Sequence, residues 1–243
     1  MNKSFVVRRN LSVREQLTAS KHLSEYIHHA IIRKEESIWV AQREGRAKDS
    51  DDRTQISLLK MLALSPEKSS FIDSIKELNI IPTALSYEYD PCDFLKAKEF
   101  QQKRDDPEYK KTQHDDLLNM ETGILGQKGR VIFRFGKCIN DELDKITEHD
   151  KRIQVEIVAG IIDREIHRNY EIYPGNYIAY DLLNDGNRFA DKYTTEDVDN
   201  FKSYLNGQIE KIDLDNKDIP FLWSKMLEMY SNTLKNYLIA TEQ

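Results

Sequence analysis

Cysteine is scarce in this sequence, which has only Cys92 and Cys138 among its 243 residues. The two cysteines lie far apart and do not have the spacing of metal ligands, so we expect two free thiols in a reducing compartment. A glycine-rich phosphate loop is also missing from the sequence. Its absence argues against the common nucleotide-binding enzymes.

Long hydrophobic runs are missing as well. No apolar stretch reaches the about 20 residues that span a bilayer, and we find no secretory signal peptide. With 39% hydrophobic and 32% charged residues, the chain is polar but still able to fold, either as one large domain or as two small ones. We therefore expect a soluble protein, or one that at most lies on a membrane surface.

Charge is unevenly distributed along the chain, whose net charge is −6. Residues 1–60 contain 12 Lys and Arg against 8 Asp and Glu, whereas the remaining residues contain 24 against 34. A basic front end on an acidic chain suggests an anionic partner near the N-terminus. Nucleic acid is not the expected partner, because the net charge is negative and basic residues are not interleaved with aromatic ones.

The order of apolar segments predicts an α/β fold. Strand-like runs alternate with helical patterns up to Ile139, and this order favours a mainly parallel sheet flanked by helices. We expect residues 1–140 to form this α/β domain and residues 141–243 to form an all-helical extension packed on it. The four expected strands are "SFVVRRN" (4–10), "SIWVAQ" (37–42), "NIIPTALSYEY" (79–89) and "GRVIFRFGKCI" (129–139).

A charged loop follows the second expected strand, within "VAQREGRAKDSDDRTQ" (40–55). Ligands of open α/β sheets bind at the carboxyl ends of strands, and Arg8 and Arg9 stand at the end of the first expected strand. Arginine can bind two phosphate oxygens at once, a neighbouring Glu44 can orient a guanidinium or bond a substrate hydroxyl, and Gly45 allows close backbone approach. A plainer alternative is that three aspartates of the loop, Asp49, Asp51 and Asp52, start the next helix and pair with the basic residues of the loop.

Three stretches, in this order, resemble the glycerol-phosphate/lysophosphatidate acyltransferase family. "SFVVRR" is similar to the family's second motif, "REGRAK" to the third, which is built around Glu-Gly-Thr-Arg, and "IIPTALSYE" to the fourth. "VIFRFGKCI" resembles a later strand of the family, with Cys138 where proline is common. The third motif lacks its threonine, so either Arg46 or Lys48 takes the place of the phosphate ligand.

The resemblance implies transfer of an acyl chain from acyl-CoA or acyl carrier protein to glycerol 3-phosphate or a lysophospholipid, without a metal or organic cofactor. It also implies a cytoplasmic protein that is peripheral at the inner face of a membrane. The implied substrate-binding residues are Arg8, Arg9, Glu44, Gly45, Arg46, Lys48 and Pro82. Pro82 shapes the neighbouring strand, and the others hold the acceptor phosphate.

The family's first motif, His-x4-Asp, supplies the general base and is missing from this sequence. No aspartate stands five positions after any of the six histidines, which are His22, His28, His29, His114, His149 and His167. We therefore expect this chain to be the C-terminal portion of a longer acyltransferase, without catalytic residues and inactive alone. The alternative is a non-catalytic relative, an interaction or anion-binding domain.

Overall fold

The computed structural model describes residues 12–45, 47–64 and 70–242. The chain forms two compact units, each assembled from three separate stretches. The first unit contains Met1–Arg46, Arg53–Pro82 and Gly136–Glu165. The second contains Ala47–Asp52, Thr83–Phe135 and Ile166–Gln243. The division that we expect after residue 140 stays a prediction.

The predicted α/β fold with a mainly parallel sheet is wrong. The structure is 58% helical, and its described residues contain a single small sheet of two strands, β1 (Thr83–Tyr87) and β2 (Val131–Phe135). These strands lie antiparallel, with Thr83 opposite Phe135 and Tyr87 opposite Val131. An apolar pattern indicates that a segment is extended, but it does not specify the partner strand or the direction of pairing.

The expected strand at residues 37–42 is also absent. These residues have no regular secondary structure, and the side chains of Trp39 and Val40 remain 65% and 38% exposed. An apolar run without a pairing partner cannot satisfy its backbone groups as a strand does. The expected strand at residues 4–10 lies outside the described residues.

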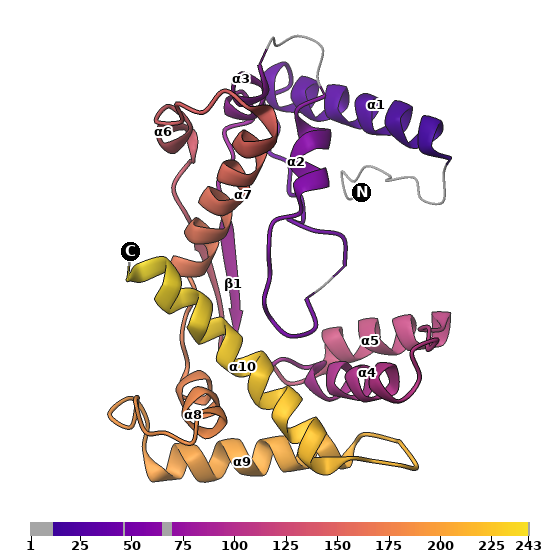
Figure 1. Ribbon diagram of the computed structural model, residues 1–243, viewed down its shortest axis with the longest axis vertical. Coiled ribbons are helices and arrows are strands. Elements are labelled where there is room, and N and C mark those ends of the chain that lie inside the picture. The colour runs from indigo at the N-terminus through magenta and orange to yellow at the C-terminus, as the bar shows by residue number, and fades with distance from the viewer. Residues whose placement is uncertain (1–11, 46, 65–69, 243) are drawn as a thin grey trace. The chain divides into compact units, whose positions relative to one another are not determined.

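Five helices carry the first unit, and Figure 1 labels them. They are α1 (Val13–Ile32), α2 (Ile56–Leu62), α3 (Phe71–Lys76), α6 (Asn140–Leu143) and α7 (Lys151–Arg168) as far as Glu165. The spacing of Ser12 and Glu15 in the sequence predicts a capping box at the start of α1, and the structure confirms it: the Ser12 side chain accepts from the backbone of Glu15, and the Glu15 side chain accepts from the backbone of Ser12.

α1 and α2 are joined by polar side chains as well as by apolar packing. The Ser24 hydroxyl donates to the Leu62 carbonyl at 2.9 Å, and His28 Nε2 lies 3.0 Å from the same oxygen. Leu62 ends α2, where carbonyls have no partner within the helix. The two buried side chains of α1 therefore satisfy the C-terminal end of α2.

The second unit is built around its last helix, α10 (Ile219–Thr241). α10 packs against three other helices of the unit, as Figure 1 shows: α4 (Asp93–Asp105), α8 (Pro174–Leu183) and α9 (Thr195–Glu210). The core between them includes Ile178, Leu205 and Met226, each no more than 1% exposed. The helical character that the sequence predicts for residues 141–243 is confirmed.

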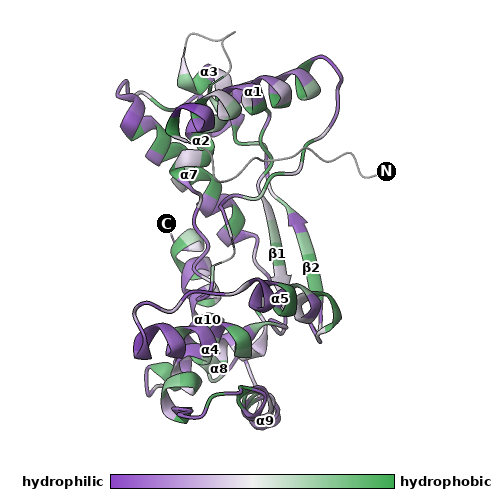
Figure 2. Ribbon diagram, turned by 90° about the vertical axis from the view of Figure 1, so that its right-hand side faces the viewer, coloured by the Kyte–Doolittle hydropathy of each residue, from purple (hydrophilic) through white to green (hydrophobic). Residues whose placement is uncertain are grey.

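The apolar residues of α5 (Gln113–Leu125) are exposed. Asn119 is its one buried residue, whereas the apolar side chains lie outward and are 37–75% exposed: Leu117, Leu118, Met120, Ile124 and Leu125. Phe133 and Phe135 of β2 are likewise exposed, and β2 is green for most of its length in Figure 2. The second unit thus has apolar surface on one helix and one strand. No helix in the described ranges is long and apolar enough to cross a membrane.

Candidate functional site

Four of the seven predicted substrate-binding residues lie within the described ranges. Arg8, Arg9 and Arg46 lie outside them. Glu44, Gly45 and Pro82 belong to the first unit and Lys48 to the second. No hydrogen bond or ion pair joins any two of these four described residues, which are Glu44, Gly45, Lys48 and Pro82.

The Glu44–Gly45 turn is solvent-exposed. The backbone N–H of Glu44 donates to Gln55 Oε1 at 2.8 Å, and the N–H of Gln55 donates to the Gln42 carbonyl at 2.9 Å, so Gln55 closes the base of the turn. Gly45 has a φ of +73° and open space where a Cβ would stand. The turn therefore needs glycine for its backbone conformation and leaves room for a ligand beside it.

Pro82 is buried directly before β1. Its carbonyl accepts from the N–H of Gly136 at 2.8 Å, immediately after β2. A Cβ on Gly136 would lie 2.6 Å from Glu165 Cγ and 2.9 Å from the Pro82 oxygen, so the close approach requires glycine. The expected role of Pro82 in shaping a neighbouring strand stays a prediction.

Lys48 contacts a buried carboxylate, Glu99 of α4, whose side chain is only 5% exposed. Lys103 Nζ lies 3.0 Å from Glu99 Oε1, and Lys111 Nζ lies 3.3 Å from Glu99 Oε2. We call Lys48, Lys103 and Lys111 the lysine cluster. Three ammonium groups from separate parts of the second unit thus converge on one carboxylate.

Electrostatics at the lysine cluster weaken the hold of Lys48 on its proton. Burial and the positive charges of Lys103 and Lys111 lower the pKa of Lys48 to about 7, while Asp116 acts in the opposite direction. Removing water from an ammonium and placing like charges beside it both disfavour the charged form. Lys48 is therefore mainly protonated below neutral pH.

Hydrogen bonds from α10 fix residues 49–52, which directly follow Lys48. Asn232 Nδ2 of α10 donates to the Asp49 carbonyl at 2.9 Å, and Asn236 Nδ2 donates to Asp51 Oδ1 at 3.0 Å. The alternative that the aspartates of this loop start the next helix is wrong, since α2 begins at Ile56 and has no acidic residue in its first turn. These residues instead position Lys48 within the second unit.

A second buried carboxylate, Asp93 of α4, was missed by the sequence analysis. Its Oδ2 accepts from the hydroxyls of Tyr204 at 2.7 Å and Tyr230 at 2.8 Å, and its Oδ1 accepts from Gln208 Nε2 at 2.6 Å. Burial raises the pKa of Asp93 to about 6, although the hydrogen bonds oppose this shift. Tyr204 and Gln208 stand four residues apart on α9, but this spacing alone does not reveal a carboxylate in contact with both.

Asp93 forms a network with Tyr204, Gln208 and Tyr230. Asp93 and Tyr230 are 0% and 5% exposed, and burial followed by the charge of Asp93 raises the pKa of Tyr230 well above its usual value. A tyrosine that holds its proton is a good donor to a carboxylate. The network therefore joins α4, α9 and α10, whereas the lysine cluster and the Glu44–Gly45 turn can meet a ligand.

Within the ranges that the structure describes, no group of three or more His, Cys, Asp and Glu side chains is arranged to hold a metal ion.

Comparison with known proteins identifies no family for this chain. No family model, curated protein or solved structure matches this chain. Its function must therefore be argued from its own residues.

Proposed function

We propose that this chain supplies the acceptor-phosphate-binding residues of an O-acyltransferase. The reaction moves an acyl chain from acyl-CoA or acyl carrier protein to glycerol 3-phosphate or a lysophospholipid. The α/β frame is no part of this proposal, because the sheet has two antiparallel strands.

The observation that carries the proposal is the pairing of two segments that resemble the family. "IIPTALSYE" contains β1 and "VIFRFGKCI" contains β2, and the two strands form one ribbon. Backbone bonds extend the pairing beyond the strands, from the N–H of Gly136 to the Pro82 carbonyl and from the N–H of Ile139 to the Ile80 carbonyl at 3.1 Å. Two motifs that are distant in sequence must lie close together in space in order to act together.

The Glu44–Gly45 turn supports the same proposal. Gly45 has a positive φ, which favours glycine, and open space where a Cβ would stand. Glu44 is exposed. A phosphate can approach such a turn closely, with a guanidinium from a neighbouring arginine as its bidentate partner. We assign that partner to Arg46, with Arg8 and Arg9 completing the phosphate site.

Proton transfer is not assigned to this chain. An acceptor hydroxyl needs a general base within hydrogen-bonding reach, and none of the six histidines has the His-x4-Asp spacing. In the proposed reaction these residues bind and orient the acceptor, and a base outside them removes its proton. The chain alone should therefore bind the acceptor without turnover.

The competing function is anion binding without catalysis, as part of an interaction domain. The observation that favours it is the lysine cluster, since a surplus of ammonium groups around Glu99 needs no catalytic partner. Both functions predict phosphate binding. They differ in whether the Glu44–Arg46 turn is required for it.

Ligand protection tests the proposal. Glycerol 3-phosphate should raise the unfolding temperature of the chain, and uncharged glycerol at the same concentration should not. At a concentration of about 100 times the Kd, the stabilisation should approach roughly 2.7 kcal/mol. Arg46→Ala should remove most of this protection.

Lys110→Ala is the matched control, because Lys110 is an exposed cation outside the turn. Equal protection of the Arg46→Ala variant and the unmodified chain would refute the proposed site. Protection by glycerol as strong as that by glycerol 3-phosphate would show that the phosphate is not recognised.

A further inference from the structure

The lysine cluster contains more positive charge than its buried carboxylate can balance. Lys48 comes from residues 47–52, Lys103 lies one helical turn after Glu99 on α4, and Lys111 precedes α5. All three contact the same carboxylate, whose single negative charge is balanced by one ammonium. Two positive charges are left over.

Asp116 does not remove this surplus. Its Oδ1 lies 3.8 Å from Lys111 Nζ, and its side chain is 70% exposed. An ion pair at that distance in water contributes little. Even with Asp116 counted as a full charge, the five side chains of the group have a net charge of about +1 below neutral pH, where lysine side chains are protonated.

Neutralising Glu99 explains one lysine but not three. A buried carboxylate is stabilised by an ion pair with further hydrogen bonds, whereas additional ammonium groups repel one another. The lowered pKa of Lys48, whose causes include the charges of Lys103 and Lys111, is consistent with that repulsion. A bound anion would relieve it.

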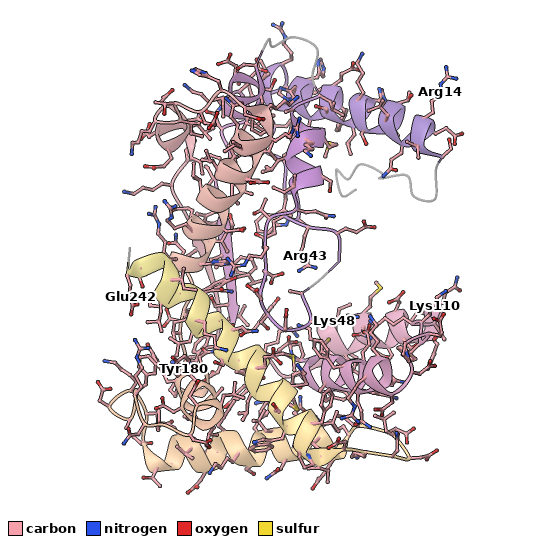
Figure 3. The ribbon with its side chains drawn as sticks, in the orientation of Figure 1. Arg14, Arg43, Lys48, Lys110, Tyr180 and Glu242 are labelled. Atoms are coloured by element: carbon pink, nitrogen blue, oxygen red, sulfur yellow. The ribbon has the colours of Figure 1, made fainter. Side chains whose placement is uncertain are left out.

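The three ammonium groups are accessible as well as close together. The side chains of Lys48, Lys103 and Lys111 are 30%, 51% and 29% exposed, while Glu99 beneath them is 5% exposed. In Figure 3, Lys48 lies beside α4, whereas Lys110 points outward from the far end of the α4–α5 pair. A ligand can therefore reach the lysine cluster from solvent while Glu99 holds the lysines from the protein side.

We propose that the lysine cluster binds a phosphate monoester, with Glu99 as the residue that positions the three lysines. A phosphate monoester is negatively charged, as the surplus of positive charge requires, and its oxygens accept hydrogen bonds from several ammonium groups at once. A neutral sugar or a cation gains nothing from this arrangement.

This inference deepens the proposed function at Lys48 but does not require acyl transfer. Two sources of the phosphate fit the same chemistry, a small phosphorylated acceptor and the 3′-phosphate of coenzyme A. Glycerol 3-phosphate represents the first source. Coenzyme A and dephospho-coenzyme A, which lacks that phosphate, represent the second.

Calorimetric titration of the whole chain with inorganic phosphate is the first test. Lys103→Gln and Lys111→Gln should each weaken phosphate binding roughly tenfold, the loss of one charge-assisted hydrogen bond. Lys110→Gln changes the net charge equally and should leave the affinity within about twofold, because an exposed charge outside the site is screened. Lys103 is half-exposed, so its variant should fold as the unmodified chain does.

Glu99→Gln provides a second prediction. Removing the carboxylate takes away the charge that holds the three ammonium groups together, so a folded Glu99→Gln chain should bind phosphate more weakly than the unmodified chain. If the unmodified chain does not bind phosphate, or if Lys103→Gln and Lys111→Gln bind it as Lys110→Gln does, the cluster serves only to neutralise Glu99 and the inference is wrong.

The two proposals can fail separately. Phosphate binding that depends on Lys103 but not on Arg46 would uphold the lysine cluster and reject the proposed acceptor site. A preference for coenzyme A over dephospho-coenzyme A that disappears in Lys103→Gln would identify the 3′-phosphate as the ligand. Binding of glycerol 3-phosphate with no such preference would identify the acceptor.

Discussion

Asp93 shows how one enclosed carboxyl group can set the pH dependence of stability. Its usual pKa of 3.8 rises to about 6 in the folded chain, chiefly because burial disfavours the charged form. The folded state therefore holds the proton at pH values where the unfolded chain has released it. The resulting stabilisation is fully present below pH 3.8 and is lost as the pH rises through about 6.

We predict that Asp93→Asn removes this pH dependence. The amide has the same shape, its oxygen can accept from Gln208, and the two tyrosine hydroxyls can turn to accept from its NH₂ group. The difference between the two pKa values corresponds to roughly 3 kcal/mol, the largest change expected between pH 4 and 7. Urea unfolding at several pH values measures it.

Asp191→Asn is the control for this experiment, because Asp191 is exposed. Between pH 4 and 7, the free energy of unfolding of Asp191→Asn should fall as the pH rises, whereas that of Asp93→Asn should stay nearly constant. A variant that keeps the original slope would show that Asp93 does not titrate in this range.

At the scale of elements, α5 differs from an ordinary surface helix because its apolar stripe lies outward. We predict that Ile124→Glu changes the free energy of unfolding by no more than about 0.5 kcal/mol, since Ile124 is 72% exposed. The same variant should bind less of a hydrophobic dye, because it interrupts the stripe. Chemical unfolding and dye fluorescence measure the two effects.

Ile178→Glu on α8 is the contrasting variant. Ile178 is 1% exposed, so a buried, unpaired carboxylate there should destabilise the chain by several kcal/mol. Strong destabilisation by Ile124→Glu as well would mean that the α5 stripe is covered in solution.

The helices could be predicted because their signals are local. The capping box at Ser12 and the apolar periodicity of α7 and α10 lie within single segments, and both α7 and α10 form within residues 141–243, which the sequence predicts to be helical. The segments of β1 and β2 were also recognisable as extended. Their antiparallel pairing was not, because it depends on residues far apart in the sequence, such as Thr83 and Phe135, which are 52 positions apart.

The candidate site was only partly predictable for the same reason. Gly45 and Lys48 stand in a run whose charge is visible in the sequence. The partners of Lys48 come from α4 and from the residue before the N-cap of α5, and nothing in the sequence pairs Lys48 with Glu99. Asp93 was missed because its three side-chain partners come from α9 and α10.

For the whole molecule, the interleaved units suggest a test of the division expected after residue 140. A fragment of residues 1–140 lacks part of the first unit and the helices α8, α9 and α10 of the second. We expect it to unfold without a cooperative transition, whereas the full chain should unfold cooperatively. Near-UV circular dichroism during heating distinguishes the two, and a sharp transition of the fragment would instead establish an independent domain.

The interleaving also has a consequence for the newly made chain on the ribosome. α1 emerges early, yet its unit includes residues up to Glu165, so at roughly 5–20 residues per second it waits on the order of ten seconds for its last partners. The second unit waits longer, because it joins Ala47–Asp52 to α10, which is translated after the other helices of the unit. Helices of the nascent chain whose apolar faces still lack their partners can bind chaperones. Slower translation should lengthen the time for which these faces are exposed.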